Sequence, residues 1–275
     1  MTHNNQLFQI YGLGYPVVLI PGFASKADSW GLQYRWLKKY FQVIVFENKS
    51  IACTQSKSED YIDIAVSDIN DALRTCSIKK VSLLGASMGA MIALEFAQRF
   101  PEKVSSLIFA SLPIDDNLSF KNLTEDLNLS IQNNSDRDFF LRKLSTVFFS
   151  PDFVKQETFN ILSDFFMQNG KSFSNDALCA QLCAVNNWLE SKKWIDGCQC
   201  PCLFIYGSED QLVSVKNTIN QLTNVFKKSE VKIINGAGHA VHIEQYQEFN
   251  DIVYDFLQKF LGSNLDGLLP KVLFS

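Results

Sequence analysis

The feature of this chain that most restricts its fold is a repeated alternation of short apolar runs with helix-like segments. The apolar runs predict strands over 16–20, 42–46, 81–85, 104–110, 203–206 and 231–234. Helical spacing or helix-forming composition predicts helices over 60–74, 88–100, 214–226 and 245–261. Continuous apolar strands that alternate with helices are typical of a mostly parallel sheet buried between helices. We therefore expect an α/β fold.

Residues 112–195 interrupt this alternation. They contain no clear strand, several helix-like pieces and a turn signal at Asn169-Gly170. Because they lie between the fourth and fifth predicted strands, we expect a helical insertion on top of the sheet. The predicted organisation is a core formed by 1–111 and 196–275 and a helical cap formed by 112–195. No structure is assigned to the tail, 263–275.

Charge and hydropathy exclude several classes of protein. The 275 residues include 25 Lys+Arg and 29 Asp+Glu, a net charge of −4, so there is no basic footprint for nucleic acid. The first residues, MTHNNQLFQIYGLGYP, lack the charged-then-apolar order of a secretory signal. No run approaches the ~20 apolar residues that a membrane span needs. We expect a cytoplasmic protein with neither a nucleic-acid partner nor a membrane span.

The cysteines raise the question of a metal site. There are 7, an odd number, which indicates free thiols in a reducing compartment. Cys198, Cys200 and Cys202 form a C-x-C-x-C pattern. A structural zinc site normally has four ligands in paired C-x₂-C spacing, and alternation would place all three side chains on one side of an extended segment. We therefore expect no metal and no other cofactor.

The residues from Gly85 to Gly89 (GASMG) fit the pattern G-x-S-x-G. The pattern alone is weak, but here an apolar run ends at Gly85 and a helix-like segment begins near Met88, as the motif requires. The two glycines permit a turn so sharp that side chains there would collide. Ser87 would then stand above the sheet at a helix N-terminus, where a developing negative charge is stabilised. We predict Ser87 as a nucleophile.

A serine hydroxyl needs a base to take its proton. The candidates are His3, His239 and His242. His3 lies near the start of the chain, whereas His239 lies in a loop of small residues directly after the strand at 231–234. His242 follows three residues later and is interpreted as a packing residue. We predict His239 as the base.

The base in turn needs an anion to hold its tautomer and to stabilise the imidazolium. Glu209 and Asp210 both follow the strand at 203–206, and their positions in the sequence do not separate them. The order serine, acid, histidine differs from that of chymotrypsin and of subtilisin.

Two backbone N–H groups are needed to hold an oxyanion. One should come from the residue after the nucleophile, Met88, and one from an earlier loop. The loop Pro21-Gly22-Phe23 follows the strand at 16–20. We expect it to supply the N–H of Phe23.

Together these residues resemble the α/β-hydrolase superfamily, in its small single-domain serine esterase branch with a helical cap. The resemblance runs from about Tyr11 to Phe260 and rests on VVLIPGF, LLGASMGAMIALEFAQRFPEKV, LFIYGSEDQLV and INGAGHAVHIEQYQEF. In that family the aspartate of a G-x-x-D-x-L-V segment is the acid, which matches Asp210. The histidine of a G-H segment is the base, which matches His239. The resemblance therefore implies Ser87, His239 and Asp210 as a catalytic triad.

Two segments depart from the family pattern. Pro21 stands where a histidine usually precedes the glycine of the oxyanion loop. The segment from Glu47 to Thr54 (ENKSIACT) replaces the usual D-x-R-G-x-G-x-S. Both flank the mouth of the family's active site, so they bear on substrate choice more than on mechanism.

Phenylalanine is enriched in the expected cap. Nine occur between 139 and 173, and we predict Phe148, Phe149 and Phe153 as residues that bind an acyl chain. The alternative is that these rings only dock the small helices of the cap. The small size and short cap are also similar to esterases that cleave pimeloyl-carrier-protein methyl ester, which would imply an acidic carrier protein as a partner.

The function predicted from the sequence is cleavage of a small or medium carboxylic ester or thioester through an acyl-enzyme. Three alternatives remain open at this point. They are a C–C bond hydrolase with the same triad, an acyltransferase, and a slow or inactive binding or receptor protein of the same fold.

Overall fold

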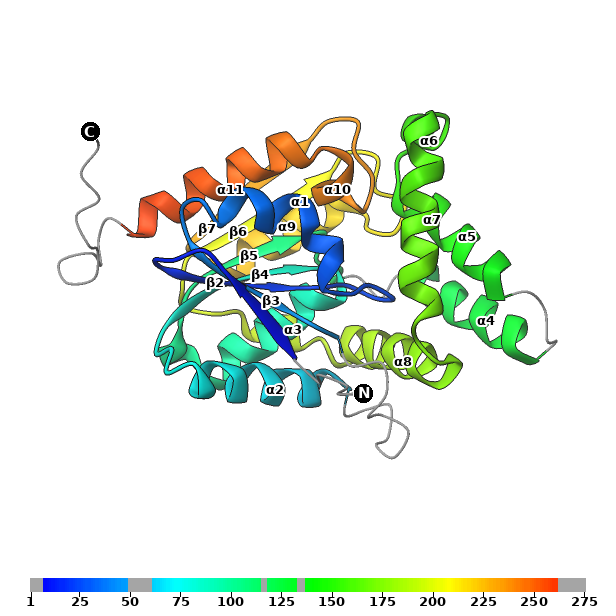
Figure 1. Cartoon of the computed structure of the whole chain (residues 1–275). Helices are drawn as coiled ribbons and strands as arrows, with labels where there is room; N and C mark the ends of the chain where they lie inside the picture. The colour runs from blue at the N-terminus through cyan, green and yellow to red at the C-terminus, as the bar shows by residue number, and fades with distance from the viewer. Residues whose placement is uncertain (1–6, 49–60, 115–117, 133–136, 262–275) are drawn as a thin grey trace, which may run out of the picture.

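The structure is a computed structural model that describes residues 7–48, 61–114, 118–132 and 137–261 (Figure 1). Its centre is a seven-stranded sheet in the order β1-β3-β2-β4-β5-β6-β7. Only β1 runs antiparallel to its neighbour, so the sheet is mostly parallel, as the sequence predicts. The strands are β1 (Phe8–Tyr11), β2 (Pro16–Ile20), β3 (Gln42–Phe46), β4 (Val81–Ala86), β5 (Val104–Ala110), β6 (Cys202–Gly207) and β7 (Ser229–Ile234).

Helices cover both faces of the sheet. Figure 1 shows α1 (Gly31–Leu37) and α11 (Tyr246–Leu261) on one side, and α2 (Tyr61–Thr75) and α3 (Met88–Arg99) on the other. Side chains of a strand point alternately to opposite faces. In β2, Val17 and Leu19 accordingly pack with the α11 layer, while Val18 and Ile20 pack with α2 and α3. This burial on both faces explains why the central strands are continuous apolar runs. The predicted α/β class is confirmed.

Between β5 and β6 the chain forms a group of helices at one end of the sheet (Figure 1). They are α4 (Leu118–Gln132), α5 (Arg137–Phe148), α6 (Pro151–Val154), α7 (Glu157–Lys171) and α8 (Asn175–Ser191). The chain then returns to the sheet, where α9 (Val215–Val225) joins β6 to β7 and α10 (Val241–Glu244) precedes α11.

The turn predicted at Asn169-Gly170 is wrong, because both residues lie in the last turn of α7. Gly170 instead permits α5 and α7 to pack closely. A Cβ atom at this position would lie 2.6 Å from Cδ2 of Leu141. The glycine therefore marks a helix contact rather than a turn.

Several short elements of the core were not predicted, β1 and α1 among them. β1 is a four-residue edge strand with two exposed residues, and α1 is only seven residues long. Neither has an apolar pattern long enough to show a period. Among the helices that the structure describes, none is long and apolar enough to cross a membrane.

Candidate active site

Ser87 lies on the sharp turn between β4, which ends at Ala86, and α3, which begins at Met88. Its backbone angles are φ 50° and ψ −115°. A residue with a side chain rarely adopts a positive φ, and such strain persists only where the surroundings hold it. Here the Ser87 N–H donates to the carbonyl oxygen of Ala110 in β5 (2.9 Å), which anchors the turn to the sheet.

The two glycines of the motif are required by close backbone contacts. A Cβ atom at Gly85 would lie 2.2 Å from the carbonyl oxygen of Gly89, and one at Gly89 would lie 2.2 Å from that of Ile20. No side chain tolerates such distances. The steric reason inferred for the two glycines from the sequence therefore agrees with the structure.

His239 and Asp210 form a buried pair beside this turn. Nδ1 of His239 is 2.9 Å from Oδ2 of Asp210, and the exposed fractions of the two side chains are 3% and 0%. Oδ1 of Asp210 accepts hydrogen bonds from the N–H groups of Leu212 (2.8 Å) and Val213 (3.0 Å). Glu209 is exposed and its side chain contacts Ser208 instead. The structure thus brings Asp210, and not Glu209, to the histidine.

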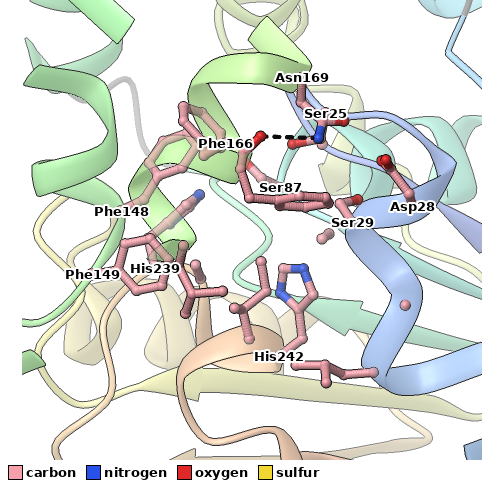
Figure 2. A pocket seen from close by; sticks show the side chains of 18 of the residues that line it. Ser25, Asp28, Ser29, Ser87, Phe148, Phe149, Phe166, Asn169, His239 and His242 are labelled. Atoms are coloured by element: carbon pink, nitrogen blue, oxygen red, sulfur yellow. Dashed lines mark hydrogen bonds between the residues drawn. The ribbon is translucent and has the colours of Figure 1, made fainter. Parts of the chain in front are cut away.

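The remaining ring nitrogen of His239 is free to act on a ligand. A carboxylate only accepts hydrogen bonds, so Nδ1 is the donor of this pair, and in a neutral imidazole Nε2 is then the acceptor. Nε2 is buried and has no hydrogen-bond partner among the described residues. Ser87 and His239 line the same pocket (Figure 2). In ligand-free sites a catalytic hydrogen bond is often long and shortens only when substrate binds.

His242 is unsuited to act as the base. Its ring packs 4.6 Å from that of Trp30 between ring centroids. Burial, and to a smaller degree the proximity of His239, lowers the pKa of His242 to about 3. A base with so low a pKa attracts protons weakly near neutral pH. The position of His242 agrees with its interpretation as a packing residue, although it also borders the pocket.

The loop after β2 touches the serine turn. A Cβ atom at Gly22 would lie 3.0 Å from the carbonyl oxygen of Ala86 and 3.6 Å from Cβ of Ser87. Phe23 lines the pocket and Met88 is the first residue of α3, so both predicted oxyanion donors belong to segments that border Ser87.

Three amide side chains that the sequence analysis did not select hold this loop. The N–H of Ala24 donates to Oε1 of Gln181 in α8 (2.9 Å). The N–H of Lys26 donates to Oδ1 of Asn169 in α7 (3.1 Å). Nδ2 of Asn48 donates to the carbonyl oxygens of Gly22 (3.0 Å) and Ser25 (3.2 Å). The loop is therefore held from the sheet and from the helical insertion at once.

One of these amides could have been noticed from the sequence alone. Asn48 belongs to the segment from Glu47 to Thr54 that departs from the family pattern, and its residues 49–54 lie outside the described part of the chain. Gln181 and Asn169 had no signal in the sequence, because their partners lie 157 and 143 positions away.

A pocket of about 330 Å³ opens beside Ser87 and His239. Its walls are mainly apolar and come from the β2 loop, α1, α7 and the segment after β7. Phe148, Phe149 and Phe166 line it (Figure 2). Phe165 lines it as well. Phe153 does not; its ring packs against that of Phe149, at 5.1 Å between centroids. The prediction for Phe153 is corrected, since it supports the wall from behind.

A buried carboxylate joins the histidine loop to the insertion. Oε2 of Glu244 accepts from the N–H of Gly238 (3.0 Å) and from the N–H of Ser150 (3.0 Å). The hydroxyl of Ser111 donates to the carbonyl oxygen of His239 (2.8 Å). These bonds fix the backbone on both sides of the imidazole.

Comparison with known proteins agrees with the fold. A family model described as alpha/beta hydrolase fold matches residues 15–246. The chain is 24% identical over 246 residues to lipase 1 of Psychrobacter immobilis, and the aligned region covers 86% of this chain and 75% of the lipase. It is 23% identical over 270 residues to the 2-hydroxy-6-oxo-6-phenylhexa-2,4-dienoate hydrolase of Comamonas testosteroni, covering 90% and 89%. The solved structure of a thermophilic esterase from Thermogutta terrifontis superimposes with a TM-score of 0.78 at 19% identity, covering 92% and 93%.

Proposed function

The chain belongs to the α/β-hydrolase fold family, and from this premise we propose that it is a serine hydrolase that cleaves carboxylic esters or thioesters. The observation that carries the proposal is the arrangement around His239. One ring nitrogen contacts the Asp210 carboxylate and the other is unpaired among the described residues, while His239 and Ser87 line the same pocket.

The proposed reaction has two halves. Nε2 of His239 takes the proton of Ser87 as Oγ attacks the carbonyl carbon, and the N–H groups of Phe23 and Met88 bind the oxyanion. The imidazolium then gives its proton to the leaving alcohol or thiol, which leaves an acyl-enzyme. Water, deprotonated by the same nitrogen, attacks the acyl carbon. The imidazolium returns this proton to Oγ of Ser87 as the bond between Oγ and the acyl carbon breaks, which releases the acid and regenerates the serine. The Asp210 carboxylate stabilises the imidazolium in both halves.

The substrate class is tested with a panel of 4-nitrophenyl esters, matching thioesters and vinylogous diketones. Turnover of the esters or thioesters is expected. Turnover confined to the diketones would replace the proposal by C–C bond hydrolysis, a reading in line with the likeness to the dienoate hydrolase of Comamonas testosteroni. Formation of a new ester when an alcohol is added would indicate acyl transfer.

Acyl length should affect the rate if the pocket holds the acyl chain. Each buried methylene contributes about 0.8 kcal/mol, so kcat/KM should rise about threefold to fourfold per CH₂ until the pocket is full. Phe166→Ala should move the optimum to longer chains, because this ring lines the pocket. Phe153→Ala is the matched control, since it also removes a phenyl ring, but one that packs behind Phe149 and does not line the pocket. A flat profile in the wild type would show that the phenylalanines only pack the insertion.

Gln181 is proposed as a positioning residue for the oxyanion loop. Gln181→Leu removes the acceptor of the Ala24 N–H, next to the Phe23 N–H, and kcat should fall about 10- to 100-fold while KM changes little. Asn186→Leu is a suitable control, because Asn186 also lies on α8 but donates to Thr124. Steady-state kinetics and thermal melting of both variants check this expectation. An equal loss of kcat in the two variants would mean that α8 acts only through stability.

A further inference from the structure

A group of three sulfur atoms lies at the N-terminal end of β6, whereas the candidate active site lies at the C-terminal ends of the strands. Cys198 and Cys200 precede β6, and Cys202 is its first residue, whereas Asp210 follows the other end of the same strand. From Cys202 to Gly207 the strand spans roughly 17 Å at about 3.3 Å per residue. The three-sulfur cluster (Cys198, Cys200 and Cys202) is therefore separate from the proposed hydrolytic site.

The alternation of these cysteines is not the extended arrangement that the sequence suggested. The chain bends at Gln199 and Cys200 before it enters β6. All three Sγ atoms lie within 4.8 Å of one another. Sγ of Cys198 is 3.2 Å from that of Cys202 and 3.6 Å from that of Cys200. In an extended segment, residues four apart would be separated by roughly 13 Å, so the bend creates the cluster.

The spacing matches that of ligands around one metal ion. With a zinc–sulfur distance of about 2.3 Å, tetrahedral geometry places sulfur ligands about 3.8 Å apart. The separations of Cys198 from Cys202 and from Cys200, 3.2 and 3.6 Å, are below this value by a few tenths of an ångström, and that between Cys200 and Cys202 is at most 4.8 Å. All three cysteines are free thiols, so no disulfide prevents their use as ligands. Small rotations of the side chains would suffice to admit an ion.

We propose that the three-sulfur cluster binds one thiophilic metal ion with a filled d shell, such as Zn²⁺. Thiolate ligands favour such ions over Mg²⁺ or Ca²⁺. Binding converts three thiols to thiolates and releases three protons to solvent. Cys202 is buried, while Cys198 and Cys200 are half-buried, so the ion has access from solvent and water can complete its coordination. The bound ion would tie the segment before β6 to the strand, and it takes no part in hydrolysis.

The experiment is a titration of the reduced full-length protein with Cd²⁺, whose bonds to thiolates give an ultraviolet charge-transfer band. The band should saturate at one Cd²⁺ per chain, and Zn²⁺ should abolish it by competition. Cys198→Ser and Cys200→Ser should each weaken or remove it. The control is the double variant Cys179→Ser/Cys183→Ser, which removes the neighbouring pair of thiols on α8 and should keep the band.

A second measurement needs no variant. Alkylation of the wild type, mapped by peptide mass spectrometry, should be slowed by Zn²⁺ at Cys198 and Cys200 and unchanged at Cys76. No band at one equivalent, a band that survives in Cys198→Ser and Cys200→Ser, or equal alkylation with and without Zn²⁺ would overturn the proposal. Ester turnover should be the same before and after treatment with a chelator, so failure of the metal site and failure of the hydrolase proposal give different results.

Discussion

Ser87→Ala is expected to lower turnover of an activated ester by roughly 10⁶-fold, the size of the loss when a triad nucleophile is removed. The physical reason is that no other hydroxyl occupies the strained turn beside His239. The change removes one oxygen from a residue that is 9% exposed, so folding should be preserved. Rates measured with 4-nitrophenyl esters, beside circular dichroism of the same samples, test both statements.

A fluorophosphonate probe provides the matching label. It should modify one serine of the wild type, located at Ser87 by peptide mapping, and none in Ser87→Ala. Labelling at another serine, or folded protein that does not react, would contradict the assignment. Ser87→Gly should be as inactive as Ser87→Ala but more stable by about 1 kcal/mol, because glycine relieves the cost of the positive φ.

Asp210→Asn should reduce kcat about 10⁴-fold, the effect of the equivalent change in a related triad. The amide cannot stabilise the imidazolium, and its N–H₂ group can hold His239 in the wrong tautomer. Asp210 also accepts hydrogen bonds from the N–H groups of Leu212 and Val213, and the side-chain oxygen of the substituted asparagine can keep those bonds. The loss should therefore appear in kcat more than in the thermal midpoint.

The control for this change is Glu209→Gln, an identical carboxyl-to-amide replacement one position away. Glu209 is exposed and lies outside the pair with His239, so kcat should stay close to the wild-type value. A larger loss in Glu209→Gln than in Asp210→Asn would show that Glu209, and not Asp210, is the acid. His239→Ala and His242→Ala, compared in the same assay, should show the greater loss for His239.

The sequence by itself was sufficient for the fold class and for the residues of the serine turn. Strands buried on both faces must be apolar throughout, so β2, β4 and β5 are visible as continuous runs. The glycines at 85 and 89 are visible because a Cβ atom at either position would lie 2.2 Å from a backbone carbonyl oxygen, which leaves room for no other residue. Such constraints fix the residue type at a given position or run of positions, so the local sequence records them even where the contacting group is distant, as Ile20 is from Gly89.

Only the tertiary structure decided which distant residues meet. It placed Asp210, which only the family resemblance had distinguished from Glu209, against His239, and it moved Phe153 from the pocket lining to a position behind Phe149. It also brought the amide of Gln181 to the N–H of Ala24 from 157 positions away. A hydrogen bond of this kind leaves no period and no spacing in the sequence, because its partners are neighbours only after the insertion has packed onto the sheet. The three-sulfur cluster shows the same limit at short range, since a bend of two residues turns an extended alternation into a compact group of three sulfur atoms.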